Sequence, residues 1–279
     1  KTEHCTWLPA TFQEESSILH IVLTQDVMHY MKHGTFFLLT ILLFSCSKND
    51  KPGSSSFDGK AYSKQSVGKS AHDLLSAADF TSLKIEIQYM PGYKPDDGVI
   101  SQVESFLKGL VNKPGGISVT ETQIPSLGKT PVSQADVIAQ ESKYRTQYAG
   151  SKEIAVYILV TDADYTDNSV LGFAYRNTSV CLFGKTIYDN SGGIGQANRI
   201  QLSATVLEHE LGHLLGLVNT GSPMQVSHVD KDHPNHCENK NCLMYYAAET
   251  TDILGFLIAG NTPSLDNNCL NDLKANGGK

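Results

Sequence analysis

Alternating apolar and polar residues predict strands, and apolar residues three or four positions apart predict helices. Residues 83–89 alternate and so predict a half-buried strand. Residues 153–160 are almost continuously apolar, which favours a strand buried on both faces. The expected elements are, in order, a strand at 83–89, a helix at 99–111, a strand at 117–123, a helix at 133–148 and a strand at 153–160. This order predicts a mainly parallel sheet with right-handed crossovers.

Two short apolar segments follow at residues 170–175 and 178–183. Their close spacing predicts a hairpin, in which the two strands run antiparallel. Residues 187–197 are rich in glycine and predict an irregular loop above a cleft. The pattern as a whole therefore predicts an α/β (α+β) fold with a mixed, mainly parallel twisted sheet and an antiparallel edge strand.

The last helical segment begins near residue 200, and its apolar positions make it a core helix. Those positions are Leu202, Val206, Leu207, Leu211, Leu214 and Leu215. The segment closes with the sequence HELGHLLG at residues 209–216. An amphipathic core helix with two partly buried histidines is the plain alternative to a functional interpretation of this sequence.

A metal site is the functional interpretation. On a helix, residues four positions apart lie on the same face, so His209 and His213 can bind one ion. Glu210 is rotated by about 100° from His209, so it can reach a metal-bound water without being a ligand. Two imidazoles on Zn²⁺ and a carboxylate that takes a proton from the bound water are the parts of a zinc hydrolase. Gly216 predicts an abrupt end of the helix, which lets the chain return with a third ligand.

Histidine is concentrated in this part of the chain, because five of the ten histidines lie between residues 209 and 236. A catalytic zinc ion keeps three protein ligands and an open position. The candidates for the third ligand are His228, His233 and His236. Each could instead lie on the surface of a loop or contact another ligand.

Residues 31–45 resemble the leader of a bacterial lipoprotein. Met31 is followed by Lys32 and by an apolar run that is too short to cross a bilayer as a helix. The sequence LFSC at residues 43–46 is similar to a lipobox, in which the cysteine, here Cys46, becomes the lipidated first residue. Ser47 follows it, as in lipoproteins that are sorted to an outer membrane.

On this interpretation residues 1–30 lie upstream of the true start, residues 46–56 form a flexible Gly/Ser-rich tether, and residues 57–279 form the mature domain. Roughly 220 residues suffice for one well-cored domain or two small lobes that share a cleft. We expect a monomer in the cell envelope of a Gram-negative bacterium, held on the outer membrane by its N-terminal lipid alone.

Charge and cysteine content further limit the partners and the disulfides that we expect for this protein. The formal net charge is −7 and no basic block occurs, which argues against nucleic acid as a partner. An exported domain meets an oxidising compartment, so an even number of cysteines after Cys46 predicts two disulfides. These cysteines are Cys181, Cys237, Cys242 and Cys269. The aspartates of residues 161–167 could hold Ca²⁺, but an acidic solvated loop is the interpretation we prefer.

The segment after Gly216 resembles a known family. His236 and Cys237 are followed by four residues and then by Cys242-Leu243-Met244. Together with HExxHxxG, this resembles the metzincin zinc peptidases, in which a third histidine and a Met-containing turn follow the zinc helix. The chain is most similar to the archaemetzincins, in which the third histidine continues as H-C-x4-C-x-M. The resemblance covers roughly residues 80–275.

The resemblance implies a metzincin-like zincin, with an N-terminal lobe at about 80–218 and a small C-terminal lobe at about 219–279, after the Met-turn. It implies a catalytic Zn²⁺ ion on His209, His213 and His236, with Met244 as an apolar floor. One departure is that Asn219 stands where the third histidine is expected, and the match resumes 17 residues later. A loop therefore interrupts the motif, and His228 and His233 stay open as alternatives to His236.

The resemblance also implies roles around the metal. Tyr246 matches the position of a tyrosine that in astacin-like and serralysin-like metzincins reaches the metal; its hydroxyl could stabilise an oxyanion, or its ring could simply pack in the substrate pocket. A peptide substrate would add itself as a strand beside the edge strand. The residues that would contact it are Leu171, Gly172, Phe173 and Ala174.

Archaemetzincins also look to hold a zinc ion with four cysteines, partly from a CxxC segment. Here that segment reads Asp266-Asn267-Asn268-Cys269 and holds a single cysteine. A zinc ion on Cys237, Cys242, Cys269 and Asp266 is one interpretation. We prefer disulfides between Cys237 and Cys242 and between Cys181 and Cys269, and we expect one catalytic zinc ion with no second zinc or Ca²⁺.

The function expected from these features is peptide-bond hydrolysis by a zinc metallopeptidase, with Glu210 as the general base. Two alternatives stay open. One is a surface lipoprotein that binds proteins or glycans and whose zinc site is structural or vestigial. The other is a zinc amidase that acts on cell-wall peptides.

Overall fold

The structure is a computed structural model that describes residues 57–279. The expectations for residues 1–30, the leader at 31–45, lipidation of Cys46 and the tether at 46–56 lie outside the described residues. Among the residues described, no helix combines the length and the apolar character that crossing a membrane requires.

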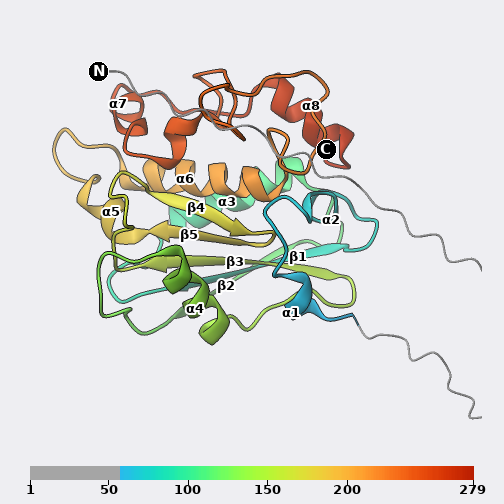
Figure 1. Cartoon of the computed structure of the whole chain (residues 1–279), viewed down its shortest axis with the longest axis horizontal. Coiled ribbons are helices and arrows are strands. Elements are labelled where there is room, and N and C mark those ends of the chain that lie inside the picture. Colours follow the sequence, from blue (N-terminus) through green and yellow to red (C-terminus); the bar gives the residue numbers. More distant parts are fainter. Residues whose placement is uncertain (1–56) are drawn as a thin grey trace, which may run out of the picture. The chain divides into compact units, whose positions relative to one another are not determined.

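A five-stranded mixed sheet forms the centre of the fold (Figure 1). Its order is β2-β1-β3-β5-β4, and every neighbouring pair is parallel except β4 and β5, which are antiparallel. The strands are β1 (Ser82–Tyr89), β2 (Ile117–Gln123), β3 (Glu153–Thr161), β4 (Gly172–Arg176) and β5 (Ser179–Phe183). The predicted mainly parallel α/β sheet with an antiparallel edge strand is confirmed, and β4 is that edge strand.

Helices cover both faces of the sheet (Figure 1). The longer ones are α3 (Asp97–Leu110), α4 (Gln134–Tyr144) and α6 (Arg199–Leu214), and the shorter ones are α1 (Gly59–Tyr62), α2 (Ala71–Leu75), α5 (Gly184–Asp189), α7 (Ile253–Ile258), α8 (Asn267–Ala275) and the 3-10 helix η1 (Tyr246–Glu249). The larger core lies between the sheet and α3 and α6, and a second core lies between the sheet and α4. Burial of these two apolar layers is the main favourable contribution to folding.

Two boundaries differ from the prediction. Helix α4 begins with the expected cap, because Ser133 and Asp136 form a capping box, but it ends at Tyr144. Arg145 leaves the helical conformation, and its buried guanidinium donates to Glu141 and to the carbonyl of Ala155. Helix α5 occupies part of the stretch that was expected to be irregular, and only the residues after Asp189 form the glycine-rich loop.

Helix α6 ends where the glycine predicted it would. Gly216 has a φ of +80°, which is a left-handed conformation that L side chains rarely adopt. A Cβ atom there would lie 2.4 Å from the backbone nitrogen of Ser222. The chain therefore turns sharply after α6. The region after residue 218, which was expected as a C-terminal lobe, packs on the side of α6 away from the sheet (Figure 1).

Candidate metal centre

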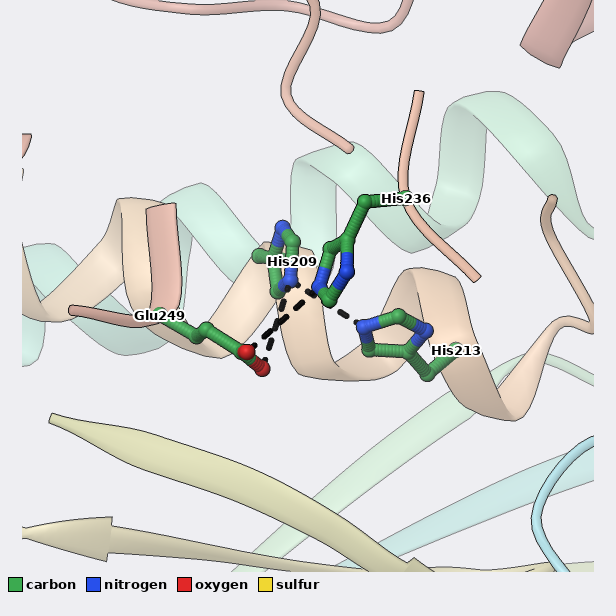
Figure 2. Close-up of side chains that lie close together, drawn as sticks. All are labelled: His209, His213, His236 and Glu249. Carbon is green, nitrogen blue, oxygen red and sulfur yellow. Dashed lines mark hydrogen bonds and ion pairs between the residues drawn. The ribbon is translucent and has the colours of Figure 1, made fainter. Parts of the chain in front are cut away.

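Three imidazoles converge beside α6 (Figure 2). His209 and His213 lie one turn apart on the helix, and their Nε2 atoms are 3.1 Å apart. His236 arrives from the loop that follows the helix, and its ring centroid lies 5.3 Å from that of His209 and 5.1 Å from that of His213. One nitrogen of each ring lies within 4.8 Å of the others, which is a spacing that one metal ion can bridge.

The other two candidate histidines lie elsewhere. His228 bonds through Nε2 to Asp272 and faces the thiol of Cys237 with Nδ1. His233 stacks on Tyr246, with ring centroids 3.6 Å apart, and bonds to Asp230. Of the three residues that the sequence left open, His236 is the one whose ring joins His209 and His213.

The environment of the three rings suits a cation. Both ring nitrogens of His236 are buried without a hydrogen-bond partner among the described residues, and such orphaned polar atoms are rare in folded proteins. Burial, together with the neighbouring rings of His209 and His236, holds the pKa of His213 well below its usual range. The neutral imidazole that results is the form that binds metal ions. The residues therefore fit a zinc ion.

A backbone contact orients the first ring. The Nδ1 atom of His209 lies 2.7 Å from the carbonyl oxygen of Leu243. In the neutral ring, that carbonyl accepts a hydrogen bond from Nδ1, and the lone pair of Nε2 then faces the other two rings. Metal-binding histidines are commonly oriented in this way by a bond to their second nitrogen.

Glu210 connects the metal group to the edge strand. Its Oε2 accepts a hydrogen bond of 2.7 Å from the backbone N–H of Ala174 on β4, while its buried Oε1 has no partner among the described residues. Burial, reinforced by the charge of Glu249, raises the pKa of Glu210 well above its usual range. A bound divalent cation would oppose this shift. The carboxylate is thus held at one oxygen and free to exchange a proton at the other.

The four residues expected to contact a substrate lie at the edge of the sheet. Leu171 is fully buried, and its N–H donates to the carbonyl of Glu249. Gly172 lies against α6, where a Cβ atom would come within 2.8 Å of Val206. Phe173 packs on the aromatic rings of Tyr165, Tyr175 and Phe183, on the opposite side of the strand. Ala174, through its N–H, is the member in contact with Glu210.

Met244 and Tyr246 follow His236 in the loop. Met244 is fully buried, and its sulfur lies so close to Gly212 that a Cβ atom there would come within 2.4 Å. Gly212 is the helix residue just before His213, so Met244 packs against α6 next to this histidine. Tyr246 stacks on His233, and its ring also lies against that of Tyr245.

Glu249 is the residue of this group that the sequence did not indicate. Its Oε1 lies 3.5 Å from Nε2 of His236, and its Oε2 lies 3.8 Å from Nε2 of His209. Burial by itself raises the pKa of Glu249, but its close contacts with the imidazoles of His209 and His236 outweigh burial and hold the pKa well below its usual range. No spacing rule marks this position, since only the path of η1 brings the side chain to the imidazoles.

The described cysteines are all free thiols, so neither predicted disulfide is formed. Cys181 on β5 packs in the core between the sheet and α4, whereas Cys269 packs in the core on the α6 side. The sheet separates these two residues, and the predicted pairing between them is wrong. Cys242 lies 3.6 Å, sulfur to sulfur, from Cys269 and is not bonded to Cys237.

A second group of side chains that could hold a metal ion lies around these sulfurs, and its members are His228, Cys237, Asp266 and Cys269. Cys237 Sγ lies 3.4 Å from Nδ1 of His228 and 3.4 Å from Oδ2 of Asp266. Cys242 Sγ accepts hydrogen bonds from the backbone N–H groups of Met244 and Asp266. Hydrogen bonds from the Cys237 and Cys269 thiols lower the pKa of Cys242 to about 4. Donors of this kind are typical of a closed, structural zinc site. We expected a single metal ion from the sequence, so this second group was not predicted.

Comparison with known proteins assigns this chain to no family. No protein-family model matches the chain, and no curated protein matches it in sequence. Among solved structures, the chain is similar to archaemetzincin (AmzA) from Methanopyrus kandleri, with 14% sequence identity and a TM-score of 0.44. The match covers 70% of this chain and 96% of that chain. The chemistry of the site is therefore derived from its own side chains.

Proposed function

We propose that the chain is a zinc-dependent peptidase that holds its metal ion with His209, His213 and His236. The observation that carries this function is the convergence of three buried imidazoles next to a buried acid, Glu210, that has one unpaired oxygen. A zinc ion in such a setting polarises a carbonyl group and acidifies a water molecule.

Glu210 has the role of the general base. Its Oε2 is tied to the N–H of Ala174, which fixes the direction of the carboxylate, and its Oε1 remains available for a proton. Burial raises the pKa of Glu210 well above its usual range, which makes the carboxylate a stronger proton acceptor. Glu210 would take a proton from water and return it to the amine that leaves.

The substrate would be an extended peptide at the edge of the sheet. β4 has a strand partner on one side, β5, and its other edge faces α6 and the metal group. A peptide that pairs with this edge would place a carbonyl group near Glu210. Residues 171–174, the residues expected from the sequence to contact a peptide, lie at the start of this strand.

A non-catalytic function has one observation in its favour. Glu249 lies next to His209 and His236, and a site closed by four protein ligands is typical of a structural zinc ion. A lipid-anchored envelope protein that binds other proteins or glycans would need no open position. This is the second candidate function.

The proposed peptidase function is tested by removing the zinc ion and then restoring it. The full chain should hydrolyse a denatured protein such as unfolded casein, lose that activity after dialysis against a chelator, and recover it with zinc but not with magnesium. New peptide termini are detected by mass spectrometry. A preparation with zinc bound at the three histidines and no turnover on any unfolded substrate would contradict the hydrolase and favour the binding protein.

A second zinc ion is expected at the sulfur group. The full chain should bind two zinc ions, and Cys269→Ser should reduce the number to one, because Cys269 is one of the four side chains, with His228, Cys237 and Asp266, that could hold an ion there. Metal analysis by mass spectrometry measures the number. Cys181→Ala is the matched control, since Cys181 is a buried thiol outside the group and its loss should leave two ions bound. A Cys242–Cys269 disulfide found in the native protein would contradict this expectation.

A further inference from the structure

The carboxylate of Glu249 points toward the imidazoles of His209 and His236 (Figure 2). In a tetrahedral zinc site with bonds of about 2.0–2.1 Å, the ligand atoms are about 3.3–3.4 Å apart. The contacts of Glu249 with Nε2 of His236 and of His209, at 3.5 and 3.8 Å, are close to that separation. One oxygen of Glu249 and one nitrogen of each histidine all lie within 4.8 Å of one another. The carboxylate thus stands where a fourth ligand would stand.

The surroundings give Glu249 no competing partner of opposite charge. Among the residues that the structure describes, the basic side chains in contact with Glu249 are the imidazoles of His209 and His236, and no lysine or arginine pairs with it. The side chain is about 28% exposed, so it is held at the mouth of the site and not in the deepest part of the core. A carboxylate in this position is costly to bury unless a cation neutralises it.

The backbone of the same segment is joined to the start of the edge strand. The carbonyl of Glu249 accepts a hydrogen bond of 2.8 Å from the N–H of Leu171, and the N–H of Thr251 donates to Ser169 at 2.8 Å. Val170 and Thr250 form an antiparallel bridge between these contacts. Backbone hydrogen bonds therefore join the segment that carries Glu249 to the residues that lead into β4.

We propose that Glu249 is a fourth, displaceable ligand of the zinc ion, which closes the site in the resting protein and leaves it when a peptide pairs along β4. Water and the Glu249 carboxylate would compete for the fourth position on the zinc ion. The resting protein would therefore be latent, that is, inactive until a peptide displaces the carboxylate. The latency rests on the proposed hydrolase function, because only an enzyme needs the open position. The role of Glu249 as a ligand does not depend on turnover.

The test compares Glu249→Gln and Glu249→Ala with the wild-type full chain, each loaded at the histidine site with zinc or cobalt(II). Zinc affinity is measured by competition with a chromophoric chelator. Access to the ion is measured by titrating the cobalt(II) protein with azide and following the visible absorption spectrum. Glu238→Gln is the matched control, because Glu238 is an exposed carboxylate two residues from His236 and outside the metal group.

Loss of a ligand should weaken zinc binding by about tenfold or more, the lower end of the range seen when even outer contacts of a metal site are removed. Both Glu249 variants should also bind azide at least about tenfold more tightly than the wild type, and Glu238→Gln should match the wild type. Because Gln has the same shape as Glu, the Gln variant distinguishes loss of the carboxylate from a folding defect in the Ala variant. Zinc affinity and azide binding within twofold of wild type in both variants would overturn the ligand role.

The rates at which the same variants cleave unfolded protein separate failure of the ligand role of Glu249 from failure of the hydrolase function. If the metal measurements change as expected and the variants cleave unfolded protein at least as fast as the wild type, both the ligand and the latency stand. If the metal measurements change but no form of the protein cleaves any substrate, Glu249 is a ligand of a closed site and the hydrolase function fails. If the metal measurements change and the variants cleave much more slowly than the wild type, the latency is overturned.

Discussion

Glu210→Gln is expected to lower kcat/KM for peptide hydrolysis by roughly 10²–10⁴-fold, the usual contribution of a general acid–base residue. The amide keeps the shape of the side chain but cannot take a proton from water. Glu210 contacts the edge strand through Ala174 and is not one of the four donors of the metal group, so zinc should remain bound. The measurements are the hydrolysis rate and the zinc content of the same preparation.

Glu208→Gln is the control for this variant. Glu208 lies on the same helix, is half-buried, and has its pKa raised to about 7 by burial, but it is not part of the metal group. It therefore tests whether any buried acid on α6 sustains the activity. Full hydrolysis by the Glu210 variant, or an equal loss in the Glu208 variant, would refute the assigned general base.

His236→Ala is expected to weaken zinc binding at the histidine site by roughly a hundredfold or more, because removing a ligand should exceed the effect of removing an outer contact. The two helical histidines alone would hold the ion weakly. Chelator competition measures the affinity, and hydrolysis should disappear at zinc concentrations that saturate the wild type.

His233→Ala is the matched control, since His233 lies in the same loop but stacks on Tyr246 and bonds to Asp230. Its removal should leave zinc affinity at the histidine site within a few-fold of the wild type. A larger loss of affinity in the His233 variant than in the His236 variant would show that the loop rearranges and that a different imidazole completes the site.

Local regularities made the fold class accessible from the sequence. The alternation at residues 83–89 and the apolar run at 153–160 reflect the two-residue period of strands, and both segments form strands of the central sheet. Short elements with weak periodicity, such as α5, α7 and α8, were not predicted, because a helix of few turns carries little pattern and depends on tertiary packing.

Cysteine pairing, in contrast, could not be predicted from local sequence patterns. The even number of cysteines predicted disulfides, yet Cys181 and Cys269 lie on opposite sides of the sheet. Whether two thiols meet depends on how strands and helices stack, and no spacing along the chain encodes that. The convergence of Cys237, Cys242 and Cys269 with His228 has the same origin.

By itself, the sequence determined what a single helix can encode: His209 and His213 share a face because they are one turn apart, Glu210 is turned away from that face, and Gly216 ends the helix. Only the tertiary structure decided which loop residues meet that face. His236 was one of three candidates, and Glu249 was not among them, because both approach through irregular backbone whose path depends on packing against α6. Contacts within one helix follow from its fixed geometry, whereas contacts between distant segments follow from the packing of the whole domain.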